Sequence, residues 1–509
     1  MTTKALKDFD AYIIKAGLDP KPHQREAVAW ALDRECARDA PCGVRGGLIA
    51  DEMGLGKTIV MMGTIVANFV PRTLIVLPLA LLAQWRSEIQ RTMGHDPLVF
   101  HGENKALISN EMLAKAPIVL TTYGHVKIGK GQGATTRLHS IPWNRVICDE
   151  AHHLRNSRTR GFAGVVALKA EIRWLITGTP IQNRIRDFFA LCACMGLPEE
   201  FYSKQENLMT IGKTFLLKRT KAEVGIQLPP LKDHEIVVPW NNEDEHKLAQ
   251  DIHSLLHFSN VSPKHGDSLI ASLDHGMLAL LVRARQSCVY PQLIAEQLQK
   301  FVEINSLQDP KAFERATNCS SKLDAVQAHI AERKHNGRSK IVFCHYRGEI
   351  DELKKRLSDV ENMHVEVMDG RTSAEQRARI TLDSPDVLIL QVQTGCEGLN
   401  LQQFSEIYFV SPNWNPAIED QAIARAHRIG QDHQVDVYRF IMEGFDKDME
   451  DTQTLDLYSQ GVQTTKRRAM RFVDGEIGEK DDEDDEDELK NIDKKYKTRD
   501  GYLKDGFTV

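Results

Sequence analysis

A glycine-containing loop that ends in Lys-Thr carries the residue types that hold and orient a triphosphate. Residues 46–50 read as a buried strand, the loop contains Gly54, Gly56, Lys57 and Thr58, and a helix with an apolar face follows. At such a junction successive backbone N–H groups face a phosphate, and the helix dipole adds to the attraction. This pattern predicts an ATP site, with Lys57 on the β- and γ-phosphates and Thr58 as a Mg²⁺ ligand.

Asp51 is the one departure of this loop from the strict phosphate-loop pattern, which has glycine at that position. We nevertheless count Asp51, at the first position of this loop, with the nucleotide-binding residues. The alternative is a glycine-rich turn followed by Lys-Thr through chance. The strand and the helix on either side of the loop argue against that alternative.

Two adjacent carboxylates, Asp149 and Glu150, end another buried strand at residues 145–150. In an open parallel sheet, ligands bind at the carboxyl ends of the strands. Asp149 is therefore expected to hold Mg²⁺, directly or through water, and Glu150 to polarise an attacking water. The alternative is a pair of ordinary acids on an exposed loop. A phosphate loop upstream favours the joint site, because the two motifs supply complementary halves of it.

Ten short apolar runs, each bounded by turn or polar residues, read as buried strands. They are 46–50, 73–77, 117–123, 145–150, 173–178, 340–344, 364–368, 386–392, 406–411 and 435–441. The segments between successive runs are long enough for crossover helices, which predicts parallel α/β sheets. Residues 232–318 between the two sets read as helical, without strong strands. The fold class is therefore α/β, with two lobes and a helical insertion.

Four segments follow from this pattern: a first lobe at 1–231, the helical insertion at 232–318, a second lobe at 319–460, and residues 461–509. The last segment is basic at 466–471, which we interpret as a brace against the lobes, a DNA contact or a solvated helix face. It then turns acidic. A row of eight carboxylates at Asp481–Glu488 repels itself and predicts a disordered tail.

The charge of the chain is unevenly distributed. Of 65 basic and 71 acidic side chains, residues 474–509 contain 7 and 14, so the remainder is close to neutral. Nucleic-acid binding needs a basic groove rather than a basic average, and it is not excluded. A hydrophobic content of 42% excludes disorder along the whole chain, and no apolar run is long enough for a transmembrane helix. Nine dispersed cysteines without a Cys-x-x-Cys pair predict neither a zinc nor a disulfide framework.

At this point an ordered set of motifs resembles the Swi/Snf-type ATPases of helicase superfamily 2. In the first half the motifs are DEMGLGKT (51–58), LIVLPLALLAQW (74–85), TTY (121–123), DEAHHLRN (149–156), LITGTPIQN (175–183) and FLLKRTKAEV (215–224). In the second half they are SSKLDAV (320–326), MDGRTSAEQR (368–377), GCEGLNL (395–401) and NWNPAIEDQAIARAHRIGQ (413–431). In their detailed residues these motifs are most similar to those of the lodestar-type termination ATPases and their RING-bearing repair relatives, although this sequence has no set of Cys and His ligands for a RING.

The resemblance implies two RecA-like lobes that close on one ATP. It implies that Gln24 reads the adenine, that Gly395 and Gln421 bind nucleotide from the second lobe, and that Arg425 and Arg428 reach the γ-phosphate when the lobes close. Their i, i+3 spacing predicts that the two arginines share one face of a helix.

Double-stranded DNA is expected to lie across both lobes. The resemblance puts Pro78, Thr121, Thr122 and the loop around Thr372 near the phosphates of one strand. It also implies that Thr177–Thr179 links the ATP state to the lobe interface, and that residues 395–400 couple DNA to the ATP site.

The function that follows is a DNA-dependent ATPase that translocates on duplex DNA, 3′ to 5′ by resemblance, and remodels or displaces bound proteins. The alternatives are a strand-separating DNA or RNA helicase, and a scaffold with an idle ATPase fold that docks histones or a polymerase through the acidic tail. Histones, nucleosomes or RNA polymerase complexes are the expected partners of that tail. We expect a monomer that does not bind membranes, located in the nucleus, or in the cytoplasm or a virion if a virus encodes it.

Overall fold

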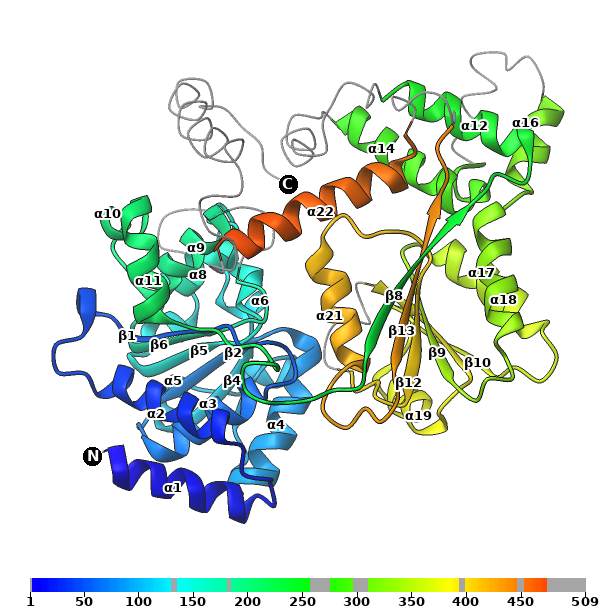
Figure 1. The fold of residues 1–509 in the computed structure, drawn as a ribbon. Coiled ribbons are helices and arrows are strands. Elements are labelled where there is room, and N and C mark those ends of the chain that lie inside the picture. Colours follow the sequence, from blue (N-terminus) through cyan, green and yellow to red (C-terminus); the bar gives the residue numbers. More distant parts are fainter. Residues whose placement is uncertain are drawn as a thin grey trace, which may run out of the picture.

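The computed structural model describes residues 2–129, 135–180, 185–256, 275–295, 310–392, 399–445 and 453–473. These residues form two lobes, each built on one parallel sheet with helices on both faces (Figure 1). This architecture confirms the predicted α/β fold class. The acidic run at 481–488 lies outside the described residues.

The first lobe is a seven-stranded sheet in the order β3-β4-β2-β5-β6-β1-β7. Its strands are β1 (Arg45–Ile49), β2 (Thr73–Leu77), β3 (Leu98–Phe100), β4 (Ile118–Thr122), β5 (Trp143–Cys148), β6 (Ala170–Ile176) and β7 (Leu216–Leu217). All of its neighbouring pairs are parallel. The predicted strands of this lobe are confirmed, and each is a buried aliphatic run, as a sheet covered on both faces requires.

Helices cover both faces of the first sheet. One face packs against α1 (Thr2–Lys15), α2 (Pro22–Cys36), α3 (Lys57–Ala67) and α4 (Leu79–Met93). The other packs against α5 (Asn110–Lys115), α7 (Arg137–Ser140), α8 (Arg160–Ala167), α9 (Ile185–Met195) and α11 (Leu208–Phe215). The short helices α6 (Tyr123–Val126) and α10 (Glu199–Tyr202) complete the lobe. The two apolar cores hold the strands rigidly, so their carboxyl ends form a fixed edge for a site.

The second lobe is a six-stranded sheet in the order β10-β11-β9-β12-β13-β8. Its strands are β8 (Leu231–Val238), β9 (Ser339–Cys344), β10 (Val365–Met368), β11 (Val387–Gln391), β12 (Phe404–Phe409) and β13 (Val435–Met442). One face packs against α14 (His275–Val289), α17 (Ser321–Glu332) and α18 (Arg347–Ser358), and the other against α19 (Ala374–Asp383) and α21 (Pro416–Ala426).

The expectation that residues 232–318 contain no strong strand is wrong at their beginning. β8 pairs in parallel with β13 from Leu231 to Val238 and extends the second sheet. Its sequence, LKDHEIVV, has an apolar run only in its last three residues, because β8 is an edge strand whose side chains are mostly exposed or half-buried. An edge strand buries little surface, so its sequence shows no continuous hydrophobic pattern.

The helical part of the insertion prediction is confirmed where the structure describes it, in α12 (Glu243–Ser254), α14 and α16 (Pro310–Thr317). Residues 257–274 and 296–309 lie outside the described residues. The four segment limits of the sequence analysis stay predictions.

The C-terminal helix α22 (Leu455–Val473) packs on α14, α21 and β13. In Figure 1 it runs from the second lobe toward the first. Lys466 donates from Nζ to the carbonyl oxygen of Trp414 (3.2 Å), and Arg467 pairs with Asp420 of α21 (2.9 Å). Two of the basic side chains at 466–471 therefore contact the second lobe, which supports their interpretation as a brace.

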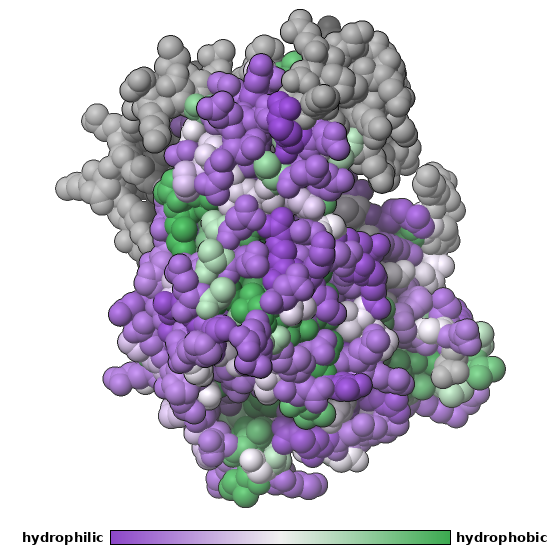
Figure 2. All heavy atoms as spheres, turned by 90° about the vertical axis from the view of Figure 1, so that its right-hand side faces the viewer, coloured by the Kyte–Doolittle hydropathy of each residue, from purple (hydrophilic) through white to green (hydrophobic). Residues whose placement is uncertain are grey.

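Hydrophilic side chains dominate the described surface on the side of the second lobe, and apolar side chains interrupt it only in small groups (Figure 2). Within the described ranges, no helix is long and apolar enough to cross a membrane.

Candidate active site

The phosphate loop lies between β1 and α3, as predicted, and its two glycines are required by its geometry. Gly54 and Gly56 have φ values of +93° and +82°, which side-chain-bearing residues rarely adopt. A Cβ on Gly56 would lie 2.3 Å from Nε2 of Gln24. Gly56 is the N-cap of α3, so the first N–H groups of an eleven-residue helix are directed at the loop.

Lys57 stands at the start of α3, with its ammonium near the predicted carboxylates. Nζ donates a hydrogen bond to the carbonyl oxygen of Asp51 (2.7 Å). Burial lowers the pKa of Lys57, and the charges of Glu150 and Asp149 oppose that shift. The structure therefore brings together the lysine and the two acids that the sequence places far apart.

Asp149 follows β5 and is held by two aromatic donors that sequence reasoning missed. Its Oδ2 accepts a hydrogen bond from Nε1 of Trp85 (2.7 Å), and its carbonyl oxygen accepts one from Oη of Tyr123 (2.7 Å). Its Oδ1 accepts from the N–H of Glu150 (2.9 Å). Burial and the adjacent Glu150 raise the pKa of Asp149, whereas the Trp85 N–H lowers it. The LLAQW run, at the C-terminal end of the motif that begins in β2, was the available signal for Trp85.

Glu150 has a left-handed backbone with φ +49°, an uncommon conformation for a residue with a side chain. Its Oε2 lies 3.2 Å from Nδ1 of His152, yet among the described residues this buried oxygen has no hydrogen-bond partner. Burial would raise the pKa of Glu150, but His152, Lys57 and Arg425 outweigh it, so the pKa is lowered. Backbone strain together with an unsatisfied buried oxygen is typical of a functional group.

The carboxylate of Asp51 forms an ion pair with an arginine at the end of the first lobe. Arg219 binds its carboxylate with both Nε (3.1 Å) and Nη2 (2.6 Å), and its Nη1 donates to the carbonyl oxygen of His23 (2.7 Å). Asp51 is almost completely buried. The structure thus uses its carboxylate to fix the start of the loop, and its role as a nucleotide ligand stays a prediction.

Gln24 lies in α2 directly against the phosphate loop. Its Nε2 donates to the carbonyl oxygen of Leu55 (3.1 Å), and Nε2 of His23 lies 3.1 Å from the same oxygen. The predicted adenine-reading residue is therefore adjacent to the loop. Thr58 lies in the first turn of α3 and is half-buried.

The second lobe contributes its predicted residues from α21 and the turn that follows it. Nη2 of Arg425 lies 3.9 Å from Oε1 of Glu150, and Nε2 of Gln421 lies 3.5 Å from Oγ1 of Thr179. A Cβ on Gly54 would lie 3.6 Å from Cβ of Arg428. Burial lowers the pKa of Arg428, and its buried Nε has no hydrogen-bond partner among the residues described. The two lobes thus meet around the phosphate loop.

The prediction that Arg425 and Arg428 share one face of a helix is wrong. α21 ends at Ala426, and His427 is its C-cap with φ −86° and ψ 78°. The side chain of Gln431 donates to the carbonyl oxygens of Ala426 (3.2 Å) and Phe404 (3.1 Å), which closes the turn. Arg428 therefore projects from this turn rather than from the helix, so the helical spacing rule does not apply.

The element at Thr177–Thr179 touches three parts of the site. Oγ1 of Thr177 lies 3.5 Å from Nδ1 of His152, and a Cβ on Gly178 would lie 3.6 Å from Nζ of Lys57. Thr179 reaches Gln421 of the other lobe. This placement agrees with the expected link between the ATP site and the lobe interface.

The residues predicted to contact DNA lie at or just after the carboxyl ends of β2, β4 and β10, and three of them, Pro78, Thr121 and Thr122, are buried. Thr121 is fully buried, and its hydroxyl donates to the carbonyl oxygen of Phe100 (2.9 Å). Its side chain therefore cannot contact a DNA strand in this conformation. Pro78 is the N-cap of α4, and Thr372 lies in the turn after β10, where its Oγ1 accepts from the N–H of Asp369. Gly395 and most of the 395–400 loop lie outside the described residues.

The donor set fits Mg²⁺. Each carboxylate oxygen of Asp149 accepts a hydrogen bond from one of the N–H groups described above and keeps a further lone pair, and Oε2 of Glu150 has no hydrogen-bond partner within the described part of the chain. Mg²⁺ prefers oxygen ligands, and it is usually held by one or two carboxylates together with substrate phosphates. The carboxylate of Asp149 and the hydroxyl of Thr58 are of this type.

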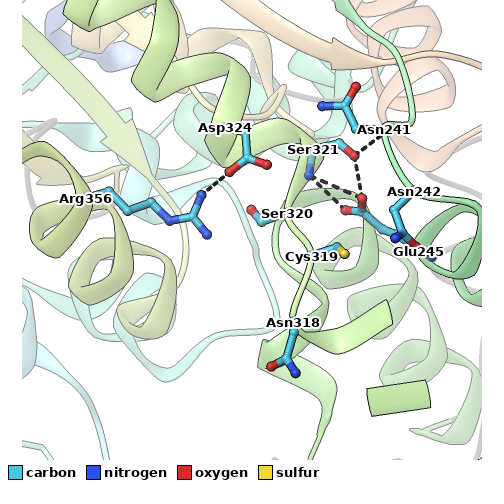
Figure 3. Close-up of a pocket in the computed structure, with 9 residues that line it drawn as sticks. All are labelled: Asn241, Asn242, Glu245, Asn318, Cys319, Ser320, Ser321, Asp324 and Arg356. Carbon is cyan, nitrogen blue, oxygen red and sulfur yellow. Dashed lines mark hydrogen bonds and ion pairs between the residues drawn. The ribbon is translucent and has the colours of Figure 1, made fainter. Parts of the chain in front are cut away.

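A separate polar pocket of about 220 Å³ lies at the junction of α12 and α17 (Figure 3). Inside it, the carboxylate of Glu245 accepts hydrogen bonds from the N–H (3.1 Å) and hydroxyl of Ser321, and Asp324 pairs with Arg356. These groups satisfy one another and hold the start of α17. The pocket is therefore a structural junction and not the site that the motifs predict.

Comparison with known proteins agrees with this geometry. The model of the SNF2-related domain matches residues 23–293, and that of the helicase conserved C-terminal domain matches residues 321–430. A probable global transactivator of Orgyia pseudotsugata multicapsid polyhedrosis virus is 31% identical over 445 residues, a match that covers 83% of this chain and 86% of the viral protein. The DNA excision repair protein ERCC-6-like of Danio rerio is 26% identical over 509 residues, which covers 83% of this chain but 34% of that protein.

Among solved structures, the Sulfolobus solfataricus SWI2/SNF2 ATPase core in complex with dsDNA is similar, with 22% identity, a TM-score of 0.38, and coverage of 89% of this chain and 97% of that one. The first family match spans more than half of the chain, and the viral relative is matched over most of its length. The chain therefore belongs to the SNF2-related, Swi/Snf-type ATPases of helicase superfamily 2, and it is an ATP hydrolase.

Proposed function

We propose that this chain is a DNA-stimulated ATPase that translocates on duplex DNA and displaces or remodels proteins bound to it. The observation that carries the proposal is that the site is shared between the lobes. Arg425 approaches Glu150 to 3.9 Å, and Arg428 lies beside Gly54 of the phosphate loop. Hydrolysis at such a site requires the lobes to be together, so each ATP cycle is tied to closing and opening.

The roles of the site residues follow from their positions. Lys57 binds the β- and γ-phosphates, and Glu150 orients and polarises the attacking water. From the second lobe, Arg428 neutralises charge on the γ-phosphate and Arg425 faces Glu150. Gln24 and Gln421 contact the nucleotide from α2 and α21. Asp149 and Thr58 would hold Mg²⁺, which neutralises the phosphate oxygens during transfer.

Asp51 has a different role in this proposal. Because Arg219 already binds both of its oxygens, Asp51 acts through the shape of the loop. The carboxylate does not contact phosphate, which would repel it.

DNA as the partner is supported by the names of the relatives. They include the DNA excision repair protein ERCC-6-like of Danio rerio, the DNA repair protein RAD5 of Candida albicans, and the chromodomain-helicase-DNA-binding protein 9 of Mus musculus. This chain spans 34%, 58% and 16% of their lengths, so the activities of the whole relatives are not carried over. Contacts from strand-end loops to phosphates would give affinity without reading sequence.

The proposal also covers which bound proteins the enzyme moves and where in the cell it acts. Nucleosomes or transcription complexes are the proteins that we expect to be moved, and the acidic tail is suited to basic partners such as histones. We propose a nuclear location and a monomeric enzyme. The viral relative named as a transactivator favours transcription complexes and is consistent with a virus-encoded version that acts in infected cells.

The test is ATP hydrolysis measured without nucleic acid and with duplex DNA, single-stranded DNA, RNA, nucleosomes and stalled polymerase complexes. Duplex DNA is expected to stimulate the rate, and displacement of a third strand from a triplex, without separation of the duplex strands, is expected to report translocation. An Arg428→Ala variant should lose about 10³- to 10⁵-fold in rate. Absence of stimulation by every nucleic acid would overturn the proposal, and strand separation would favour a helicase.

A further inference from the structure

The segment that joins the two sheets, residues 218–230, is bonded to the acids at the start of the phosphate loop. It begins after β7 and ends at β8. The N–H of Glu52 donates to the carbonyl oxygen of Arg219 (2.9 Å), and Arg219 binds the carboxylate of Asp51. The connection between the lobes is therefore also a fixed support of the phosphate loop.

Lys221 in this segment bonds to both lobes. Its N–H donates to Oε2 of Glu52 (2.8 Å), and its Nζ lies 2.8 Å from Oε1 of the same carboxylate. Nζ also donates to the carbonyl oxygen of His427 in the second lobe (3.2 Å). Lys221 is only 7% exposed, so its charge is satisfied mainly by these two groups.

His427 is well placed to transmit this contact, since it directly precedes Arg428. As the C-cap of α21 it presents a carbonyl at the negative end of the helix dipole, which favours a cation there. Its Nε2 lies 2.8 Å from the carbonyl oxygen of Pro229, to which it donates. The joining segment therefore holds both the main chain and the side chain of the residue next to the arginine.

The phosphate loop completes the arrangement. A Cβ on Gly54 would lie 3.5 Å from Cε of Lys221 and 3.6 Å from Cβ of Arg428. The stem of Lys221 and that of Arg428 thus flank the same glycine. A shift of the second lobe away from the first would break the contact between Lys221 and His427 but would leave that between Lys221 and Glu52 intact.

We propose that Lys221 is a positioning residue for ATP hydrolysis, which bonds the phosphate loop through Glu52 to the arginine-bearing turn through His427 and so sets the place of Arg428. This assignment rests on the role of Arg428 proposed above. Lys221 touches no reacting atom in this proposal. It converts closure of the lobes into a defined distance between Arg428 and the loop.

Kinetics of matched lysine variants test the assignment. Lys221→Met keeps the length of the side chain but removes the ammonium, and Lys221→Arg keeps the charge. The control is Lys213→Met, which alters an exposed lysine of α11. We expect Lys221→Met to lower kcat by up to about 10²-fold, as misplacement of a reactive group does, with little change in the KM for ATP. Lys221→Arg should recover most of kcat, and Lys213→Met should match the wild type.

A distance measurement separates positioning from general support of the fold. Paramagnetic labels on unnatural amino acids at Met112 and Leu382, two exposed positions in different lobes, report the separation of the lobes in the presence of a non-hydrolysable ATP analogue without labelling the exposed Cys36 and Cys42. Wild type is expected to give one narrow distribution and Lys221→Met a broader one, at equal thermal stability. Unchanged kcat, or an equal loss in kcat and affinity with an unchanged distribution, would overturn the assignment.

If Lys221→Met does not fold, Glu52→Gln replaces it, because this change weakens the ammonium's anchor at a partly exposed side chain. It should reproduce the kcat defect and the broader distribution, and a wild-type kcat would overturn the assignment. These readouts use basal ATP hydrolysis, so they hold whether or not DNA stimulates the enzyme. Loss of DNA stimulation in the wild type contradicts the proposed function instead, and a fully active Arg428→Ala variant contradicts the arginine's role.

Discussion

The two ends of β5 each carry buried charged side chains, but they differ in how completely these charges are paired. Arg145 lies near the amino end and Asp149 directly follows the carboxyl end, so they are separated by only four residues. Both are buried in the first lobe. Only the charge at the amino end is completely paired within the described residues. This difference distinguishes a structural ion pair from a candidate ligand-binding site.

At the amino end, Arg145 and Glu35 form a bidentate pair with both side chains fully buried. The carboxylate also accepts hydrogen bonds from Nε1 of Trp174 (2.7 Å) and Nδ2 of Asn68 (2.6 Å). Arg145 further donates to the carbonyl oxygen of Asn68 (2.7 Å). The network leaves no place for a ligand, and it ties α2 to β5 and β6.

At the carboxyl end, the charges lack complete pairing within the described residues. Oε2 of Glu150 and Nε of Arg428 are buried without a hydrogen-bond partner, and Arg425 lies 3.9 Å from Glu150. Glu150 also has a strained backbone. Buried charged groups without hydrogen-bond partners are costly. They are explained if a triphosphate and its cation complete their bonding.

Among changes at the two ends of β5, the largest effect is expected from Glu150→Gln at the carboxyl end. If Glu150 polarises the attacking water, as proposed, its loss should lower kcat by about 10²- to 10⁴-fold. Binding of a fluorescent ATP analogue should persist, because Lys57 and the loop remain. The same change at Glu111, an exposed acid, is the control. Normal turnover by Glu150→Gln would contradict the view that the carboxyl end of β5 is catalytic and the amino end structural.

Glu35→Gln at the amino end should affect stability rather than turnover. It leaves the buried guanidinium of Arg145 without a full counter-charge, which costs about 3–5 kcal/mol of unfolding free energy. Denaturant unfolding followed by circular dichroism measures this cost. Asp96→Asn, which breaks an exposed pair with Arg86, should leave the unfolding free energy nearly unchanged, because solvent screens such a pair. A strong kcat defect in folded Glu35→Gln enzyme would contradict the comparison.

His253 extends the comparison to a buried, fully paired group in α12 of the helical insertion. Its Nδ1 donates to the carbonyl oxygen of Ala249 (2.7 Å), and its Nε2 accepts from the N–H of Leu455 (3.0 Å) at the start of α22. Burial lowers the pKa of His253 to about 4, from 6.5.

Because the folded state binds this proton less readily than the unfolded chain, stability should fall as the pH drops from 6.5 towards 4. The loss attributable to His253 is about 3 kcal/mol. His253→Gln should flatten the pH dependence of unfolding over this range, whereas His364→Gln, at a half-exposed histidine, should not. Equal slopes for His253→Gln and wild type would rule out this source of acid sensitivity.

The smallest effect is expected from Trp85→Phe, which removes one donor to Asp149 and keeps most of the packing. Loss of a hydrogen bond that orients a metal ligand typically weakens metal affinity about tenfold. We expect the Mg²⁺ concentration for half-maximal activity to rise by about that factor, and Mn²⁺ binding followed by electron paramagnetic resonance to weaken equally. Trp143→Phe removes a tryptophan donor that bonds to Leu138, away from the site, and should leave both unchanged.

Much of this site could be predicted from the sequence because it depends on local pattern. The strand, loop and helix around Lys57 form from neighbouring residues, and buried aliphatic runs mark the parallel strands whose carboxyl ends meet at one edge. Asp149 and Glu150 end such a run. Their approach to Lys57 therefore followed from sheet geometry, without knowledge of any side-chain contact.

The tertiary structure decided what the neighbouring groups do. It turned Asp51 toward Arg219, buried the hydroxyl of Thr121, and ended α21 before Arg428. It also made β8 a strand by pairing it with β13. Each outcome depends on partners that are distant in the chain, and hydrogen bonds between such partners leave no periodic trace in the sequence. The sequence by itself determined which chemistry is present, whereas packing decided which charges were left for a ligand.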